Sequence, residues 1–264
     1  LDLLLECYSY LPFEQRVRDH IAAGRVIYRP RHRVDQLVRA SGVVTGVRGS
    51  VLAPDASPRG VASNRIVEGE FEYGGQAVVV TSGGIGGNHD LVRANWPQRL
   101  GEAPADMLTG VPAYVDGRML AITEAAGGAV VNRDRMWHYV EGVRNWDPVW
   151  PGHAIRILAG PSAMWFDGRG NRLPAPYFPG FDTLGTLDHL QHTGVEHSWF
   201  ILNRALAGKE FALSGSEQNL DLTERRYRDV LKRPITAVQP SVQAFLDHGE
   251  DWLTADTIGE LVAK

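Results

Sequence analysis

The sequence contains little cysteine, little lysine and no long hydrophobic run. Cys7 is the only cysteine in 264 residues, so no intrachain disulfide and no metal site built on several cysteines can form. The densest apolar run, Ala77–Val80, is far shorter than the ~18–20 residues that cross a bilayer. A single cysteine suits a reducing compartment, so we expect a cytoplasmic protein without a membrane span.

Positive charge is limited, and arginine carries almost all of it. The chain has 27 Lys plus Arg, of which only three are Lys, against 31 Asp plus Glu, and its formal net charge is -4. This balance provides no general positive field, so we expect no nucleic-acid partner. The guanidinium groups of arginine can still bind anions locally.

The order of apolar patterns in the first half predicts an α/β fold. Apolar positions up to Val17 have helical spacing, with an interruption expected at Pro12. Residues 76–82, QAVVVTS, are apolar on both faces, which is typical of a strand buried inside a sheet. A helix is predicted between residues 116 and 128. Short β-rich runs, interpreted as a β-meander, lie at 25–30, 34–40, 43–52 and 65–73.

The second half has a different composition. Eleven aromatic residues lie between Met136 and Phe200, in a segment that is also rich in Pro and Gly, and this predicts a second structural unit. Helices are predicted at 217–233, 240–247 and 254–264, the last with a capping pattern at its start.

The turn Thr81–Asn88, TSGGIGGN, is the first candidate for a functional site. Glycines allow backbone amides to approach a phosphate or a flat cofactor closely, because a Cβ atom would collide at that distance. The strict dinucleotide pattern G-x-G-x-x-G is not met, since His89 stands where its last glycine would be. From the residues alone, a cofactor contact and an ordinary turn at the end of a strand both remain open.

Two other kinds of chemistry find weak support. No G-x-S-x-G motif is present, so a serine nucleophile of the α/β-hydrolase type is not expected. His189, His192 and His197 are close in sequence, but Gly194 separates the third from the helical i, i+3 pair. A zinc hydrolase built on these histidines ranks third among the hypotheses, and we expect no metal.

The segment 132–142, NRDRMWHYVEG, places titratable side chains beside large aromatic rings. A substrate pocket requires such a mixture, because aromatic rings form its walls and a His or Tyr can transfer a proton. Packing of the same rings in a core is the alternative interpretation.

Several stretches together resemble a known superfamily. They are the β-meander followed by VVVTSGG, then GIGGNHDLVRANWP, VDGRMLAITEAAG, DRMWHYVEG and GPSAMWFDGRGNRLP. From about residue 25 onward the chain is similar to the fumarate reductase, succinate dehydrogenase and 3-ketosteroid dehydrogenase superfamily of FAD enzymes, and most closely to its bacterial FAD-binding dehydrogenases. The resemblance implies FAD as the cofactor, and a partial FAD-binding domain with a mixed α/β substrate cap domain.

The resemblance also implies which residues contact the flavin. Residues 81–84 occupy the place of an A-T-G-G turn that packs on FAD, and the Asp-Gly pair at 116–117 corresponds to a T-G-D-G turn near the cofactor. Val34 corresponds to a residue whose backbone contacts adenine. The implied cofactor-binding residues are Val34, Thr81, Ser82, Gly83, Gly84, Asp116 and Gly117.

Two departures from the family bear on the substrate. Where dicarboxylate-handling relatives have a substrate histidine, the sequence has Tyr139, with His138 one residue earlier, and their proton-transferring arginine corresponds to Thr186. Fumarate or succinate is therefore not expected, and a larger, flatter or more apolar carbonyl compound fits the aromatic segment better. The implied catalytic residues are Tyr139 and His138, with Arg135 or Arg172 for an anionic or carbonyl oxygen.

The family's N-terminal G-x-G-x-x-G turn and its C-terminal flavin segment are both missing, so we interpret the sequence as the middle of a longer flavoenzyme. The expected domains are a partial FAD-binding domain over 1–101, the cap over 102–213 and a helical segment over 214–264 that returns toward the flavin domain.

The predicted function is FAD-dependent dehydrogenation or reduction of a C–C bond adjacent to a carbonyl, with hydride transfer through flavin N5. The alternative is a non-catalytic binding or assembly module that does not hold FAD and forms a homo-oligomer through exposed sheet edges.

Overall fold

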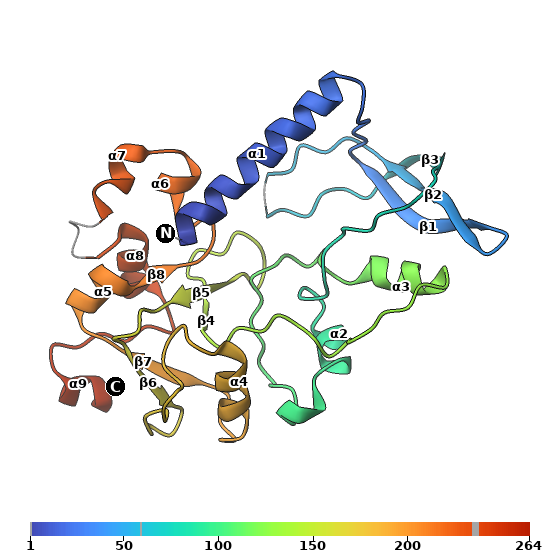
Figure 1. Cartoon of the computed structure of the whole chain (residues 1–264). Helices are drawn as coiled ribbons and strands as arrows, with labels where there is room; N and C mark the ends of the chain where they lie inside the picture. The colour runs from blue at the N-terminus through green and yellow to red at the C-terminus, as the bar shows by residue number, and fades with distance from the viewer. Residues whose placement is uncertain (1, 59, 234–237) are drawn as a thin grey trace. The chain divides into compact units, whose positions relative to one another are not determined.

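A computed structural model describes residues 2–58, 60–233 and 238–264 (Figure 1). The chain forms two compact units that alternate along the sequence. Unit 1 comprises Leu1–Ser9, Trp96–Gly110 and Met136–Lys264, and unit 2 comprises Tyr10–Asn95 and Val111–Arg135. Both units contain helices and antiparallel strands, which confirms the predicted α/β class.

Helix α1 (Asp2–Ala22) opens the chain and contains Pro12. The predicted helix is confirmed, but the predicted interruption at Pro12 is wrong. Proline removes one intrahelical hydrogen bond, and a helix of 21 residues retains enough of the others to continue past it. The chain leaves the helix at Gly24, which has a φ of 67°.

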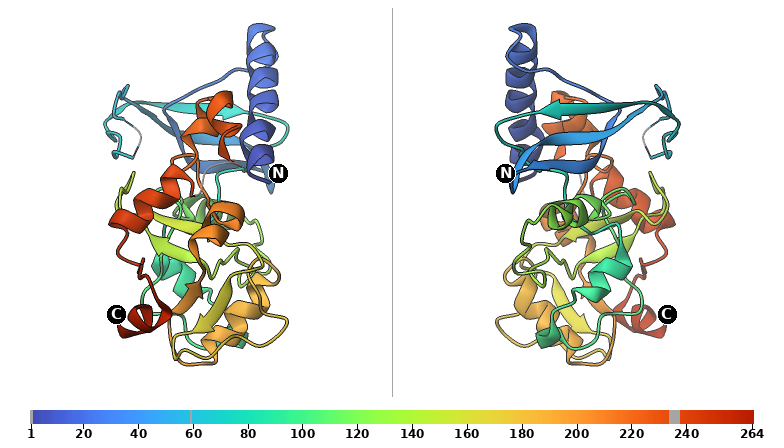
Figure 2. Two further views of the ribbon diagram at one scale, coloured as in Figure 1. Left: turned by 90° about the vertical axis from the view of Figure 1, so that its left-hand side faces the viewer. Right: turned by 90° about the vertical axis from the view of Figure 1, so that its right-hand side faces the viewer.

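Unit 2 is built on a three-stranded antiparallel sheet in the order β1 (His32–Ala40), β2 (Val43–Leu52) and β3 (Val67–Gly74) (Figures 1 and 2). The predicted β-meander is therefore confirmed for its last three runs. Strands β1 and β2 are joined by the turn Ser41-Gly42, in which both residues have positive φ (51° and 83°). The register shifts between Val34 and Gln36, so Asp35 is an extra residue in β1, as in a β-bulge.

Two of the predicted strands are wrong. Within the described structure, residues 25–30 and 76–82 form no strand, and Ile27 and Val79 are 74% and 83% exposed. A β-rich sequence becomes a strand only where a neighbouring strand supplies hydrogen-bond partners, and neither segment has such a neighbour in the described ranges. The apolar pattern of QAVVVTS thus predicted burial that this fold does not provide.

Two short helices complete unit 2. Helix α2 (His89–Ala94) follows the glycine-rich turn directly, and the Asn88 side chain caps it by accepting a hydrogen bond from the Leu91 amide (3.0 Å). Helix α3 (Arg118–Ala125) lies between Gly117 and Gly127, which have φ values of 77° and 87°. The helix predicted between residues 116 and 128 is therefore confirmed.

Unit 1 contains two small antiparallel sheets. One has the order β4 (Gly142–Arg144), β5 (Ala154–Leu158) and β8 (Ala212–Leu213), and the other pairs β6 (Met164–Asp167) with β7 (Ser198–Ile201). The connecting segments include the short 3-10 helix η1 (Gln98–Leu100) and the helices α4 (Thr183–Gln191) and α5 (Arg204–Glu210).

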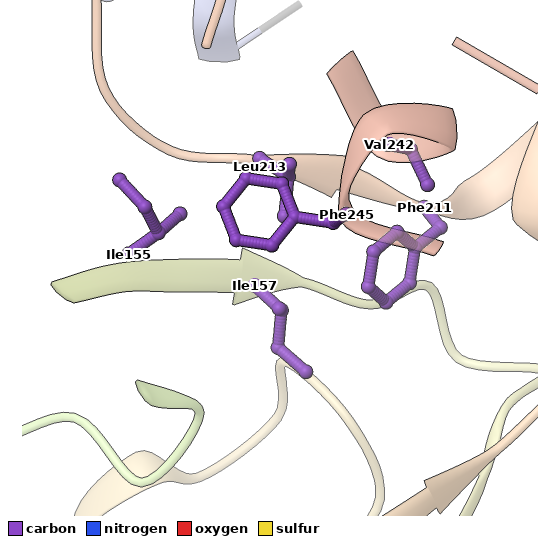
Figure 3. Close-up of a cluster of buried hydrophobic side chains, with 6 residues drawn as sticks. All are labelled: Ile155, Ile157, Phe211, Leu213, Val242 and Phe245. Carbon is purple, nitrogen blue, oxygen red and sulfur yellow. The ribbon is translucent and has the colours of Figure 1, made fainter. Parts of the chain in front are cut away.

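The main apolar core of unit 1 forms between β5, β8 and helix α8 (Pro240–His248) (Figure 3). Alternate residues of a strand face opposite sides of a sheet, so Ile155 and Ile157 both point into this core while Arg156 points away from it. The core cluster consists of Ile155, Ile157, Phe211, Leu213, Val242 and Phe245. A second cluster consists of Trp165, Leu173 and Leu190.

The C-terminal part of unit 1 is helical in short pieces. Two single turns, α6 (Leu220–Thr223) and α7 (Tyr227–Val230), replace the one helix predicted over 217–233, because Arg225 between them has a φ of 58° that a continuous α-helix does not allow. The helix predicted at 240–247 is confirmed as α8, and the helix predicted at 254–264 forms over a shorter range, as α9 (Ile258–Ala263). Thr257 and Glu260 form the capping box of α9.

The compact units alternate along the chain, whereas the three expected domains are consecutive. Residues 96–110 belong to unit 1 and residues 111–135 to unit 2. Compactness does not define which residues bind a flavin or a substrate, so the functional domains over 1–101, 102–213 and 214–264 stay a prediction. Among the described helices, none combines the length and the apolar character that crossing a membrane requires.

Candidate functional site

Three segments that are far apart in the sequence meet within unit 2. They are residues 34–35 in β1, the glycine-rich turn 83–88 and the turn 115–118 at the start of α3. The Gly87 amide donates a hydrogen bond to the Val115 carbonyl (2.8 Å), and the Asn88 side chain donates one to the Asp116 carbonyl (3.4 Å). Each segment contains residues predicted to bind the cofactor, so the fold gathers these residues into one region of unit 2.

Glycines allow the two turns to approach closely. A Cβ atom on Gly87 would lie 2.5 Å from the Pro112 carbonyl oxygen, and one on Gly117 would lie 2.7 Å from a methyl group of Leu91 and 2.8 Å from one of Ile85. The Pro112 carbonyl is backbone and leaves no room for a side chain on Gly87, and Gly117 also has a φ of 77°, so both positions favour glycine for packing within the chain. Gly117, which was predicted from the resemblance as a cofactor residue, therefore also has a structural role.

Arg118 connects the third segment to β1. Its Nη1 donates a hydrogen bond to the Val34 carbonyl (2.6 Å), and its Nη2 pairs with the Asp35 carboxylate. Hydrogen bonds from Arg33 and Ser50 also reach Asp35. Burial raises the pKa of Asp35, but these hydrogen bonds and the nearby guanidinium charges outweigh burial, and the pKa is lowered. Sequence reasoning missed Arg118, although its place directly after the Asp-Gly pair was a usable signal.

Part of the glycine-rich turn is open. Ser82, Gly83 and Gly84 are exposed, as is Thr81, and within the described part of the chain their amides donate no hydrogen bond. A Cβ atom on Gly84 would have no atom within 4 Å. Unbonded amides on a glycine turn fit a flat or anionic cofactor, because they can approach it closely and donate to it. The residues present therefore fit one wall of a flavin site.

The predicted catalytic residue His138 lies in unit 1 and is half-buried. Its ring packs against Trp96, with ring centroids 4.8 Å apart, and its Nε2 is buried without a hydrogen-bond partner among the described residues. Burial, and to a smaller extent the charge of Arg99, lower the pKa of His138. The imidazole is therefore neutral at pH 7.

Tyr139, the next residue, has different surroundings. The guanidinium of Arg156 lies 3.9 Å from the centroid of the Tyr139 ring, which is a cation–π contact. Arg156 Nε in turn donates a hydrogen bond to the carboxylate of the buried Glu141 (3.4 Å). Sequence reasoning missed Arg156, although a single charged residue in the apolar strand AIRIL was a signal for it.

The other two predicted arginines, Arg135 and Arg172, are both on the surface. Arg135 is the last residue of unit 2 and is exposed. Arg172 lies in unit 1, is exposed and pairs through its backbone with Phe166. In the described residues, no hydrogen bond, ion pair or ring contact joins the Arg172 side chain to His138 or Tyr139. Roles for Arg135 and Arg172 stay predictions.

The resemblance predicted that Thr186 corresponds to the proton-transferring arginine of the dicarboxylate-handling relatives. Thr186 is fully buried in α4, and its hydroxyl donates a hydrogen bond to the Asp182 carbonyl (2.6 Å). A hydroxyl that is bonded to the helix backbone and removed from solvent does not transfer a proton to a substrate. The exclusion of fumarate and succinate as substrates stays a prediction.

The zinc hypothesis depended on three histidines, His189, His192 and His197. His189 stacks on Tyr177 with ring centroids 5.0 Å apart, and His197 packs edge-on against Trp199. Over the ranges that the structure describes, no group of three or more His, Cys, Asp or Glu residues is arranged to hold a metal ion. The histidines have separate packing partners instead of a common centre.

Comparison with known proteins defines the class of this protein. The FAD binding domain family matches residues 11–258, and the chain belongs to this family. FAD is accordingly the cofactor that the family assigns, in agreement with the open glycine turn of unit 2.

Two similar proteins come from mycobacteria. The chain is 56% identical over 251 residues to a KsdD-like steroid dehydrogenase of Mycolicibacterium smegmatis. It is 53% identical over 252 residues to the KsdD-like steroid dehydrogenase Rv0785 of Mycobacterium tuberculosis. Both alignments cover 95% of the chain but only 45% and 44% of the relatives, so the chain spans less than half of their length. No solved structure matches the chain.

Proposed function

We propose that this chain is part of an FAD-dependent dehydrogenase or reductase that acts on a C–C bond adjacent to a carbonyl group in a flat, apolar, steroid-like molecule. The observation that carries the proposal is that the glycine-rich turn contacts the turn 115–118 through Gly87 and Asn88 and leaves residues 82–84 open, in a chain of the FAD binding domain family. The names of the mycobacterial relatives support the steroid part of the proposal.

In this proposal, unit 2 holds the cofactor. FAD, when bound, supplies the centre that accepts or donates hydride. The chain contributes backbone amides of the open turn and the Asp-Gly turn that packs beside it. The residues assigned to cofactor binding are Val34, Thr81, Ser82, Gly83, Gly84, Asp116 and Gly117.

Substrate chemistry is assigned to unit 1. Tyr139 is the residue for carbonyl binding or proton transfer, because its ring is partly exposed and its hydroxyl has no hydrogen-bond partner among the described residues. His138 is the second candidate for carbonyl binding or proton transfer, because its Nε2 has no hydrogen-bond partner among the described residues. Arg135 and Arg172 stay candidates for a contact with an anionic or carbonyl oxygen.

Titration with FAD tests the proposal. Flavin fluorescence is measured as the chain is added, and a saturable quenching gives the Kd. Gly84→Val places a branched side chain in the open space of the turn, and we expect it to weaken FAD binding roughly tenfold or more without changing the unfolding temperature. The matched control is Gly69→Val in β3, where a Cβ atom also has no atom within 4 Å, and its Kd is expected to equal that of the wild type.

The competing function is a binding or assembly module that does not hold FAD. One observation favours it: in the described structure the amides of residues 77–84 donate no hydrogen bond, and Val79 and Val80 are exposed, so this segment can pair with a strand of another molecule. No binding up to millimolar FAD, together with concentration-dependent self-association, would contradict the proposal that this chain holds FAD by itself and would support the module. We also propose that the protein is cytoplasmic, because a sequence with a single cysteine suits a reducing compartment.

A further inference from the structure

Arg156 and Tyr139 form a pair of polar groups with unused hydrogen-bonding capacity. Arg156 donates from Nε to Glu141, but within the described residues its Nη1 and Nη2 donate no hydrogen bond. The Tyr139 hydroxyl likewise has no partner there. Two donor groups and a hydroxyl are therefore available beside one aromatic ring.

The orientation of Arg156 follows from strand β5. Ile155 and Ile157 occupy the core face, so Arg156 occupies the opposite face. The residue across from it on β4 is Gly142, which has no side chain to cover the guanidinium. The ring of Tyr139, 3.9 Å away, covers one side of it.

Glu141 holds the guanidinium in place. Its side chain is 4% exposed, and Arg156 is its ion-pair partner in the described structure. A buried carboxylate that pairs with Nε restricts the rotation of the arginine and leaves the Nη edge for another acceptor. The guanidinium is thus fixed before any ligand arrives.

Exposed aromatic surface adjoins this pair. Trp137 is 85% exposed and Tyr139 is 43% exposed, and their ring centroids are 6.0 Å apart. Large aromatic rings exposed this close together are a surface on which a flat apolar molecule can pack.

We propose that Arg156 and Tyr139 bind the carbonyl oxygen of a flat apolar ketone whose body packs on Trp137 and Tyr139. Arg156 is then the residue that makes the site specific for a ligand with an oxygen at one end, because a guanidinium left without an acceptor disfavours the ligand that lacks it. This inference depends on the proposed function, since it names the group that recognises the substrate of that reaction.

The test compares two ligands that differ in one oxygen. A 3-keto-4-ene steroid and its 3-deoxy analogue are each bound to the chain at saturating FAD, and the two Kd values are measured by equilibrium dialysis. We expect the wild type to prefer the ketone. Arg156→Gln combined with Glu141→Gln, which avoids a lone buried carboxylate, should lower this preference about 10-fold to 100-fold and leave the Kd of the deoxy analogue unchanged. Tyr139→Phe should lower the preference for the ketone about 2-fold to 10-fold.

Arg204→Gln is the matched control, since Arg204 is an exposed arginine of unit 1 that bonds to Gln243, and it should keep the wild-type preference. An unchanged preference in both the double variant and Tyr139→Phe would overturn the inference and leave Arg156 as the structural partner of Glu141. If the wild type binds FAD but shows no preference for the ketone, the inference about Arg156 and Tyr139 is also overturned, and the proposal that the chain binds FAD is unaffected. The proposal that the chain binds FAD is contradicted only by an absence of binding in the FAD titration.

Discussion

Unit 1 and unit 2 are stabilised in different ways. Of the buried apolar side chains in the described residues, fifteen lie in unit 1 and five in unit 2, although unit 1 is less than twice as long as unit 2. Unit 2 depends instead on the hydrogen bonds of its three-stranded sheet and on polar networks such as Arg118 with Asp35. The two candidate sites follow this division: the flavin site presents backbone groups of closely packed turns, and the substrate site presents side chains anchored beside a packed core.

The largest expected effect concerns the core of unit 1. Phe245 is fully buried in that core, so Phe245→Ala should destabilise unit 1 by about 3–5 kcal/mol through lost burial and a residual cavity. Hydrogen exchange should then show the amides of β5 and β8 losing protection while those of β1 and β2 keep theirs. Phe181→Ala, at an exposed position of the same unit, should cost about 1 kcal/mol or less. Equal losses of protection in both units would show that they unfold as one.

The sheet of unit 2 is tested by a glycine pair. A Cβ atom on Gly49 in β2 would lie 1.9 Å from the Arg33 carbonyl oxygen, so Gly49→Ala forces the two strands apart and should cost about 1–3 kcal/mol. Gly69→Ala in β3 meets no atom within 4 Å and is the matched control. The measurement is amide exchange in β1 and β2, and equal exchange in the two variants would contradict the importance of strand contact for unit 2.

A smaller effect is expected at α9, which belongs to unit 1 but has no buried residue. Thr257→Ala removes the acceptor for the Glu260 amide and should cost about 1 kcal/mol, confined to this helix. Thr257→Ser retains the oxygen and should exchange its α9 amides at the wild-type rate. A loss of protection that reached the main core would show that α9 is coupled to it.

The smallest expected effect is a pH dependence in unit 1. The lowered pKa of His138 means that the unfolded chain binds its proton first as pH falls, so stability is highest above about pH 6.5 and declines below it. Unfolding temperatures are compared between pH 8 and pH 5 for the wild type and for His138→Gln. The variant should have the shallower decline, and identical declines would mean that burial of His138 contributes nothing to the pH dependence.

Local signals in the sequence predicted local structure well. The β-meander, the helix bounded by Gly117 and Gly127 and the capping box at Thr257 all depend on residues close in sequence, and all are confirmed. The segment QAVVVTS was predicted wrongly because burial requires partners from elsewhere in the chain, which a pattern of apolar residues cannot reveal. The division at Arg225 was missed for a different reason, since an arginine seldom has a positive φ.

The site could be predicted only in part. The resemblance indicated the turns that the fold brings together around Gly83 and Asp116, because glycine-rich turns are recognisable in sequence. Arg118 and Arg156 were missed because their importance comes from what they contact, Val34 and Asp35 in one case and Tyr139 and Glu141 in the other. Contacts between residues 15 to 84 positions apart are set by the fold and not by the neighbouring sequence.

The alternation of the two units along the chain has a consequence for synthesis on the ribosome. Unit 2 is complete only when residues 111–135 have emerged, and residues 96–110 must wait for the rest of unit 1, which begins at Met136. Both units include residues that come after residue 110, so neither unit can finish folding before that later part of the chain has been made.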